Sequence, residues 1–191
     1  MNILKKYPIP FAILLLVAID QITKYLVQHN LEIGQTLFMF RGFGIKYVIN
    51  KGMVFHLFED FEHIRLIRII GIPIIFPLSF FLYQFYIYKC GKSRLIVSAF
   101  IFVMAGAIGN YSDIAVLGYA RDFLVWPGPG KPNLADLFVD TGLILFTIEL
   151  IRNPRVKLKG RFFDGSGTKE FFSFSRNEIT KLFSNSKGVK I

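Results

Sequence analysis

Four long apolar segments divide the chain, and each approaches the length of a membrane crossing. They cover residues 8–27, 64–88, 95–109 and 133–151. An α-helix rises about 1.5 Å per residue, so roughly twenty residues span about 30 Å, the thickness of the hydrocarbon layer. Two prolines inside the second segment, Pro73 and Pro77, predict a kink there. The pattern therefore predicts an all-α membrane protein with four transmembrane helices.

Between the first two apolar segments, residues 28–63 are too polar to cross a membrane. Within this segment, residues 35–40 and 43–49 are rich in aromatic and β-branched side chains, and Arg41-Gly42 separates them. Two such runs around a short break are typical of a β-hairpin. We therefore expect a small β-sheet between the first two helices.

Composition supports the membrane assignment and limits the chemistry. Hydrophobic residues make up 53% of the chain and charged residues 19%, and the mean hydropathy is +0.47. Soluble domains carry about 25% charged residues. The single cysteine, Cys90, excludes an intramolecular disulfide and a cysteine-based metal cluster. The length fits one membrane domain, residues 1–151, followed by a C-terminal tail, residues 152–191.

The net charge of +10 is distributed unevenly around the apolar segments. Ten of the 23 Lys and Arg residues lie in the tail, and five more lie in the N-terminal head and in residues 89–94. The positive-inside rule then places both termini in the cytoplasm. Residues 28–63, and residues 110–132 that we expect as a loop, face the outside, so the predicted sheet is extracytoplasmic. Because the cations flank apolar segments, we do not expect nucleic acid as a partner.

Four carboxylates lie in residues 105–140, the stretch that joins the end of the third apolar segment to the start of the fourth: Asp113, Asp122, Asp136 and Asp140. Carboxylates at the edge of the hydrocarbon layer are costly to desolvate, so they usually face protein or a water-filled cavity. Two close carboxyl groups share a proton, and one then activates water while the other protonates a carbonyl. Three interpretations stay open from this pattern alone: a hydrolytic pair, interfacial helix caps, or the path of a small proton or cation transporter. A transporter needs such groups near the middle of the membrane, whereas Asp122 and Asp136 fall at its outer edge.

Other hydrolase chemistries lack their motifs in this chain. There is no HExxH zinc motif in the sequence. The three histidines, His29, His56 and His63, all lie in residues 28–63, with no nucleophile motif beside them. We therefore expect neither a metal nor a cofactor, and a carboxylate pair is the chemistry that remains.

Five short motifs follow one another along the predicted helices and loops. They are DQITK at 20–24, NKGMVF at 50–55, GNYSD at 109–113, GYARDF at 118–123 and NLAD at 133–136. In this order they resemble the motifs of the lipoprotein signal peptidase (signal peptidase II) family, over residues 5–151. The resemblance implies an intramembrane aspartic endopeptidase of the bacterial cytoplasmic (inner) membrane. It also implies a diacylglyceryl-modified prolipoprotein as substrate, cut before its lipidated cysteine.

The resemblance further implies roles for single residues. Asp122 and Asp136 occupy the positions of the catalytic pair. The positions that support the site or bind substrate are Asp20, Lys24, Asn50, Gly52, Asn110, Asp113 and Asn133. Asn133, three residues before Asp136, also has the spacing of a helix N-cap. The helix dipole favours negative charge there, so we expect Asp136 to be mostly ionised and Asp122 mostly protonated.

The chain departs from the family pattern at several positions: Val54, His56, Ile114, Ala120 and Pro132. The departure at Ile114 is the most serious. Ile114 stands where the family has an arginine after GNxxD. Lys51 and Arg121 are two cations that can supply the missing charge. A non-catalytic, lipoprotein-binding relative is therefore kept as an alternative.

The tail, residues 152–191, has no counterpart in the family pattern. It carries ten cations against three anions, with six phenylalanines among them. Basic and aromatic side chains on the cytoplasmic side suit anionic lipid head groups. Binding of single-stranded nucleic acid is a weaker interpretation of the tail, and a disordered, solubilising tail is the other alternative. We expect the protein to be a monomer.

Overall fold

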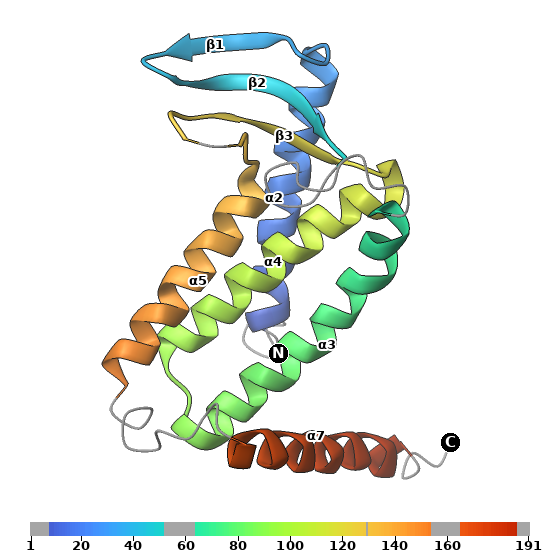
Figure 1. Ribbon diagram of the computed structural model, residues 1–191, viewed down its shortest axis with the longest axis vertical. Helices are drawn as coiled ribbons and strands as arrows, with labels where there is room; N and C mark the ends of the chain where they lie inside the picture. Colours follow the sequence, from blue (N-terminus) through green and yellow to red (C-terminus); the bar gives the residue numbers. More distant parts are fainter. Residues whose placement is uncertain (1–7, 52–63, 129, 154–164, 187–191) are drawn as a thin grey trace.

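The computed structural model describes residues 8–51, 64–128, 130–153 and 165–186. The helices are α2 (Pro8–Asn30), α3 (Ile64–Cys90), α4 (Arg94–Leu117), α5 (Leu134–Arg152) and α7 (Gly165–Ser186), and the strands are β1 (Thr36–Phe40), β2 (Phe43–Asn50) and β3 (Ala120–Val125). Helices α2, α3, α4 and α5 form a bundle. The sheet lies at one end of this bundle, and α7 lies across the other end (Figure 1).

Among the residues that the structure describes, three helices are long and apolar enough to cross a membrane: Pro8–Asn30, Ile69–Cys90 and Arg94–Leu117. Large apolar side chains such as Leu14 and Ile74 stay exposed on the outside of the bundle, which suits contact with lipid. The prediction of a mostly helical membrane protein with a small sheet is confirmed at this level. The fourth predicted helix, α5, has 19 residues, and its sequence LADLFVDTGLILFTIELIR includes charged side chains near both ends.

Small residues let α4 and α5 approach closely. A Cβ atom on Gly106 would collide with the backbone carbonyl oxygen of Ala135, and one on Gly142 would lie 2.6 Å from Val103 Cγ2. Membrane helices associate largely through such close packing, because lipid gives no hydrophobic drive between them. The contact fixes the first turn of α5, which carries Asp136, against α4.

The sheet has the strand order β1-β2-β3, and both pairs are antiparallel. β1 and β2 form the predicted hairpin, and Arg41 and Gly42 in its turn take positive φ angles of 50° and 85°. β3 comes from the segment between α4 and α5, so only two of the strands lie between the first two helices as predicted. Its pairing with β2 places Asp122 opposite Val48.

The expectation of a loop over residues 110–132 was wrong in two places. α4 continues to Leu117 and ends at Gly118, whose left-handed conformation (φ 83°) suits a residue without a Cβ atom. Ala120–Val125 then forms β3. Whether a segment forms a strand depends more on its pairing partner than on its intrinsic preference. The partner of β3 is β2, which lies far earlier in the chain, so the local sequence pattern does not predict this strand.

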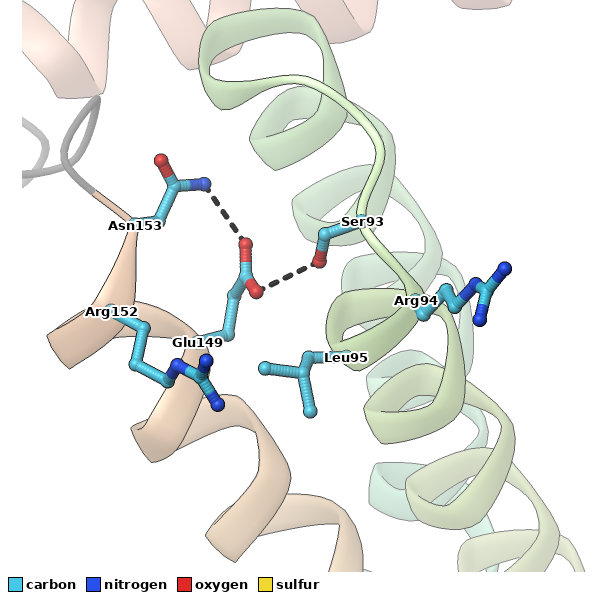
Figure 2. A pocket seen from close by; sticks show the side chains of 6 residues that line it. All are labelled: Ser93, Arg94, Leu95, Glu149, Arg152 and Asn153. Atoms are coloured by element: carbon cyan, nitrogen blue, oxygen red, sulfur yellow. Dashed lines mark hydrogen bonds between the residues drawn. The ribbon is translucent and has the colours of Figure 1, made fainter.

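At the end of the bundle away from the sheet, the buried carboxylate of Glu149 joins three helices. It accepts hydrogen bonds from Tyr86 Oη of α3 (2.9 Å), Ser93 Oγ before α4 (2.8 Å) and Asn153 Nδ2 after α5 (2.9 Å). Figure 2 shows Ser93 and Asn153 converging on Glu149 from the two neighbouring helix ends. Because a buried carboxylate needs such partners, the cluster holds these helix ends together.

Candidate active site

The predicted site residues come together where the sheet meets the bundle. Gly52 lies outside the described residues. Each of the other eight belongs to one connected network of hydrogen bonds and ion pairs, built from α2, α4, β2, β3 and the start of α5. These are Asp20, Lys24, Asn50, Asn110, Asp113, Asp122, Asn133 and Asp136.

Asn133 bridges the two predicted catalytic aspartates. Its side-chain amide donates to Asp122 Oδ1 (2.7 Å), and its backbone N–H donates to Asp136 Oδ2 (2.9 Å). The Asn133 side-chain oxygen accepts a hydrogen bond from the backbone N–H of Asp136 (3.1 Å), which completes a capping box at the start of α5. The predicted N-cap is confirmed. The N–H groups and the dipole at this helix end stabilise the ionised form of Asp136.

Asp122 lies in β3 and is almost completely buried, with 2% of its surface exposed. Burial, and after it the nearby charge of Asp136, raises the pKa of Asp122 to about 6. Hydrogen bonds from Asn133 and from Asn50 Nδ2 (2.9 Å to Oδ2) act in the opposite direction. The raised pKa makes Asp122 suited to carry the proton of a shared pair.

Lys24 and Asp20 are fully buried and form an ion pair of 2.9 Å. Lys24 Nζ also donates to Asn110 Oδ1 (3.0 Å), and Asn110 Nδ2 donates to Asp136 Oδ1 (2.7 Å). Asp20 accepts a hydrogen bond from the backbone N–H of Ala135 (2.9 Å), in the first turn of α5. The pair therefore positions Asp136 by two routes, through an amide and through the helix backbone.

Arg121 precedes Asp122, the predicted catalytic aspartate of β3, and binds Asp113. Its guanidinium donates to both Asp113 oxygens (2.6 and 3.1 Å), and its backbone N–H donates to Asp113 Oδ2 (3.0 Å). Two further bonds of 2.9 Å run to the side chains of Gln21 and Gln28 on α2. Ile114, at the position of the family's arginine, is a buried apolar residue. Arg121 thus supplies a guanidinium to the GNYSD aspartate from a different position in the chain.

Gln21 is a site residue that sequence reasoning did not single out. Its amide nitrogen donates to Asp20 (3.1 Å), the Gly109 carbonyl (2.9 Å) and Asp113 (3.1 Å). Its oxygen accepts a hydrogen bond from Arg121 (2.9 Å). The available signal was its place inside the DQITK motif. Gly109 permits this arrangement, because a Cβ atom there would lie 2.6 Å from Asp20 Oδ2.

The ion pairs of the described network do not include Asp122 and Asp136, the two aspartates that Asn133 bridges. Two buried cations, Lys24 and Arg121, pair with carboxylates other than Asp122 and Asp136. Within the described residues, the bridged pair receives its hydrogen bonds from amide and backbone N–H groups. Two neighbouring carboxylates, Asp122 buried and Asp136 partly buried, have no ion pair with a cation among the described residues. Such a pair favours one shared proton, which is the arrangement of a general acid and a general base.

Comparisons with known proteins identify relatives of this chain. The family model described as Signal peptidase (SPase) II matches residues 12–152. The lipoprotein signal peptidase of Fusobacterium nucleatum is 33% identical over 156 residues, which cover 77% of this chain and 90% of the relative. The lipoprotein signal peptidase of Bartonella henselae is 32% identical over 142 residues, which cover 72% of this chain and 84% of the relative.

Two solved structures share the fold. One bacterial membrane enzyme, obtained by the in meso method at 2.3 Å resolution, has a TM-score of 0.67 at 22% identity, covering 77% of this chain and 89% of its own. Another, at 1.9 Å resolution, has a TM-score of 0.55 at 21% identity, covering 76% and 94%. At these identities the likeness concerns the fold alone. The family match and the relatives at 32% and 33% identity carry the assignment: the chain belongs to the signal peptidase II family.

Proposed function

We propose that this protein is an intramembrane aspartic endopeptidase that removes signal peptides from diacylglyceryl-modified prolipoproteins, cutting before the lipidated cysteine. The curated relatives carry the name lipoprotein signal peptidase, which supports the substrate class. One observation carries the aspartic mechanism: Asn133 hydrogen-bonds both Asp122 and Asp136 inside a buried network.

In the proposed reaction, a water molecule lies between the two aspartates. Ionised Asp136 accepts a proton from this water as the water oxygen bonds to the scissile carbonyl carbon. Asp122, in the protonated form that its pKa of about 6 leaves partly populated at neutral pH, gives its proton to the carbonyl oxygen, which forms a tetrahedral diol. The proton on Asp136 then passes to the leaving nitrogen as the C–N bond breaks, and one hydroxyl proton of the diol returns to Asp122. Both carboxyl groups end in their starting states.

The neighbouring residues orient the pair and do not react. Asn110 holds one oxygen of Asp136, and Lys24 polarises that amide by donating to its oxygen. Arg121 holds β3 against α2 and α4. The other residues proposed to support the pair or to bind substrate are Asp20, Asn50, Gly52, Asp113 and Asn133.

We propose four transmembrane helices, with α5 as the fourth, in the bacterial cytoplasmic membrane. The exposed apolar side chains of α5, among them Leu143 and Ile144, support this, as does the burial of Glu149 inside the bundle. The distribution of cations supports a cytoplasmic position for both termini and an outer position for the sheet and the aspartates. Residues 1–151 then form the peptidase domain, and residues 152–191 form a cytoplasmic tail.

We further propose that the protein works as a monomer on its prolipoprotein substrate, and that the tail contacts anionic membrane lipid. Nucleic acid is not among the proposed partners. The positive charge of the tail lies beside the membrane domain, where anionic head groups are the nearest partners of opposite charge.

The two alternative functions have less support. A proton or cation transporter would place its carboxylates near the middle of the bundle, whereas β3 and the start of α5 lie at the sheet end (Figure 1). A non-catalytic relative was considered because of Ile114. Arg121 removes much of that reason, since its guanidinium binds both oxygens of Asp113.

Cleavage of a diacylated prolipoprotein by the purified protein tests the proposal. Asp122→Asn and Asp136→Asn should each reduce turnover to background in a protein that still expresses and folds. Because the pair works as a unit, the double variant should be little worse than either single variant. The matched control is Asp140→Asn, which removes an exposed carboxylate of α5 and should keep activity. Substantial turnover by either single variant of the pair would refute the aspartic mechanism.

A further inference from the structure

One face of α7 is fixed to the end of α3, on the side of the bundle away from the sheet (Figure 1). Phe171 and Phe174 pack on Phe85 near the end of α3, with ring centroids 5.4 and 5.6 Å apart. An ion pair between Lys89 and Glu170 joins the same two helices. α7 therefore lies where a candidate membrane span, Ile69–Cys90, ends.

A neighbouring face of α7 presents large apolar side chains to the surroundings. Phe172 is 65% exposed and Ile179 is 40% exposed. The two residues are seven positions apart, about two helical turns, so they lie on one side of the helix. A line of exposed apolar side chains along one side of a helix indicates a surface that contacts a membrane or another protein.

Basic and polar side chains continue the pattern around the helix. Lys169 and Arg176 are exposed, and each lies three positions before one of the two apolar residues, so a basic stripe runs beside the apolar one. Asn177 is exposed on a different side of the helix. An apolar, a basic and a polar face in this order are typical of a helix that lies in the plane of a membrane interface.

We propose that α7 lies in the cytoplasmic interface of the membrane and binds anionic lipid there, an inference that rests on the cytoplasmic position proposed above for the tail. Phe172 and Ile179 enter the acyl region, and Lys169 and Arg176 meet the phosphate groups. The position of α7 favours this occupant, because its attachment to the end of α3 holds it at the membrane boundary. The charge also fits, since the cytoplasmic leaflet is negatively charged and the tail is strongly basic. This apolar and basic surface of α7 lies away from the aspartates, and the two experiments below that test it do not require substrate.

Fluorescence of the full chain in phosphatidylethanolamine–phosphatidylglycerol vesicles tests the depth of α7. The only native tryptophan, Trp126, is first replaced by phenylalanine, and then Phe172→Trp or Asn177→Trp adds one reporter. We expect lipids brominated in the acyl chain to quench most of the emission of the Phe172→Trp protein, and acrylamide in water to quench little. The Asn177→Trp protein should show the reverse. Equal quenching of the two proteins, or stronger acrylamide quenching of Phe172→Trp, would overturn the proposal.

Ile179→Trp provides a second reporter on the apolar stripe, in case Phe172→Trp does not fold. The charge is tested by adding Lys169→Ser and Arg176→Ser to a reporter chain. We expect these changes, removal of phosphatidylglycerol, or high salt each to shift emission to longer wavelength and to weaken bromolipid quenching. Bromolipid quenching that stays the same without phosphatidylglycerol, at high salt and after both cations are replaced would overturn the preference for anionic lipid.

Discussion

Replacing Asp122 by asparagine should abolish activity and, at neutral pH, increase the free energy of unfolding. Asp122 is 2% exposed, and its pKa is raised from 3.8 to about 6, first by burial and then by the charge of Asp136. The folded protein therefore holds this proton more tightly than the unfolded chain does. Protonation of Asp122 stabilises the fold, and its ionisation destabilises it.

The size of the effect follows from the two pKa values. The stabilisation is fully present below pH 3.8 and is lost as the pH rises through about 6. One pKa unit corresponds to about 1.4 kcal/mol, so the ionised carboxylate lowers the free energy of unfolding by about 3 kcal/mol. Asparagine cannot ionise. We expect Asp122→Asn to be more stable than the parent by about 3 kcal/mol near pH 7.5, and nearly equal to it near pH 4.

The hydrogen bonds of the site can accommodate the new amide. The oxygen of the new asparagine can keep the hydrogen bond from Asn133. Its NH₂ group takes the place of Asp122 Oδ2, the oxygen that accepts a hydrogen bond from Asn50 Nδ2 in the parent protein. A half-turn of the Asn50 amide presents Oδ1 to that NH₂ group, and Oδ1 is buried without a partner in the described structure. The number of hydrogen bonds is then unchanged, so the electrostatic difference should dominate.

Thermal unfolding in detergent micelles at acidic and neutral pH measures this difference. Asp140→Asn is the control, because it removes the same charge from an exposed position and should shift the midpoint little at either pH. An Asp122→Asn protein that unfolds at or below the parent's midpoint at neutral pH would refute the reasoning. So would a gain of equal size at both pH values, because the penalty exists only when Asp122 is ionised.

Three further changes test the supporting structure. Lys24→Met leaves Asp20 buried without its 2.9 Å ion-pair partner and should lower the free energy of unfolding by about 3–5 kcal/mol. Denaturant titration measures this loss, and an unchanged midpoint would contradict the stabilising role of the ion pair. Gly106→Ala should lower the melting temperature because its Cβ meets α5, whereas Gly71→Ala, with nothing within 4 Å, should not; equal effects would argue against close α4–α5 contact. Ending the chain after Arg155 removes α7 and should leave cleavage in detergent intact; lost cleavage would mean that the tail acts on the site.

The helices were predictable because a membrane crossing requires a long apolar segment, which is a local property of the sequence. α2 and α3 begin at the first residues of the predicted segments, Pro8 and Ile64. The last part of α4 was missed because Asn110 and Asp113 interrupt the apolar pattern. Both side chains find their partners inside the bundle, which the local sequence does not reveal. β3 was missed for a related reason, since its partner strand is distant in sequence.

The candidate site was predictable as a set of motifs but not as a network. The N-cap at Asn133 follows from its spacing of three residues before Asp136, so the sequence alone predicted it, and the structure adds the reciprocal bond of a capping box. The contact between Arg121 and Asp113 depends on how β3 returns to α4, so sequence reasoning could only name Arg121 as one of two cations. Gln21 was missed because the resemblance assigned roles only to Asp20 and Lys24 within the DQITK motif, and a glutamine between them has no distinctive pattern of its own.

The central claim is that the bridged pair of aspartates hydrolyses the peptide bond before a lipidated cysteine. The most direct measurement is mass spectrometry of the fragments released when the full-length protein meets a diacylglyceryl-modified prolipoprotein in vesicles. We expect the parent protein to release a signal peptide that ends immediately before the lipidated cysteine, and folded Asp136→Asn protein to release none. A fragment from the Asp136→Asn protein, or a parent protein that cuts at another bond, would contradict the claim.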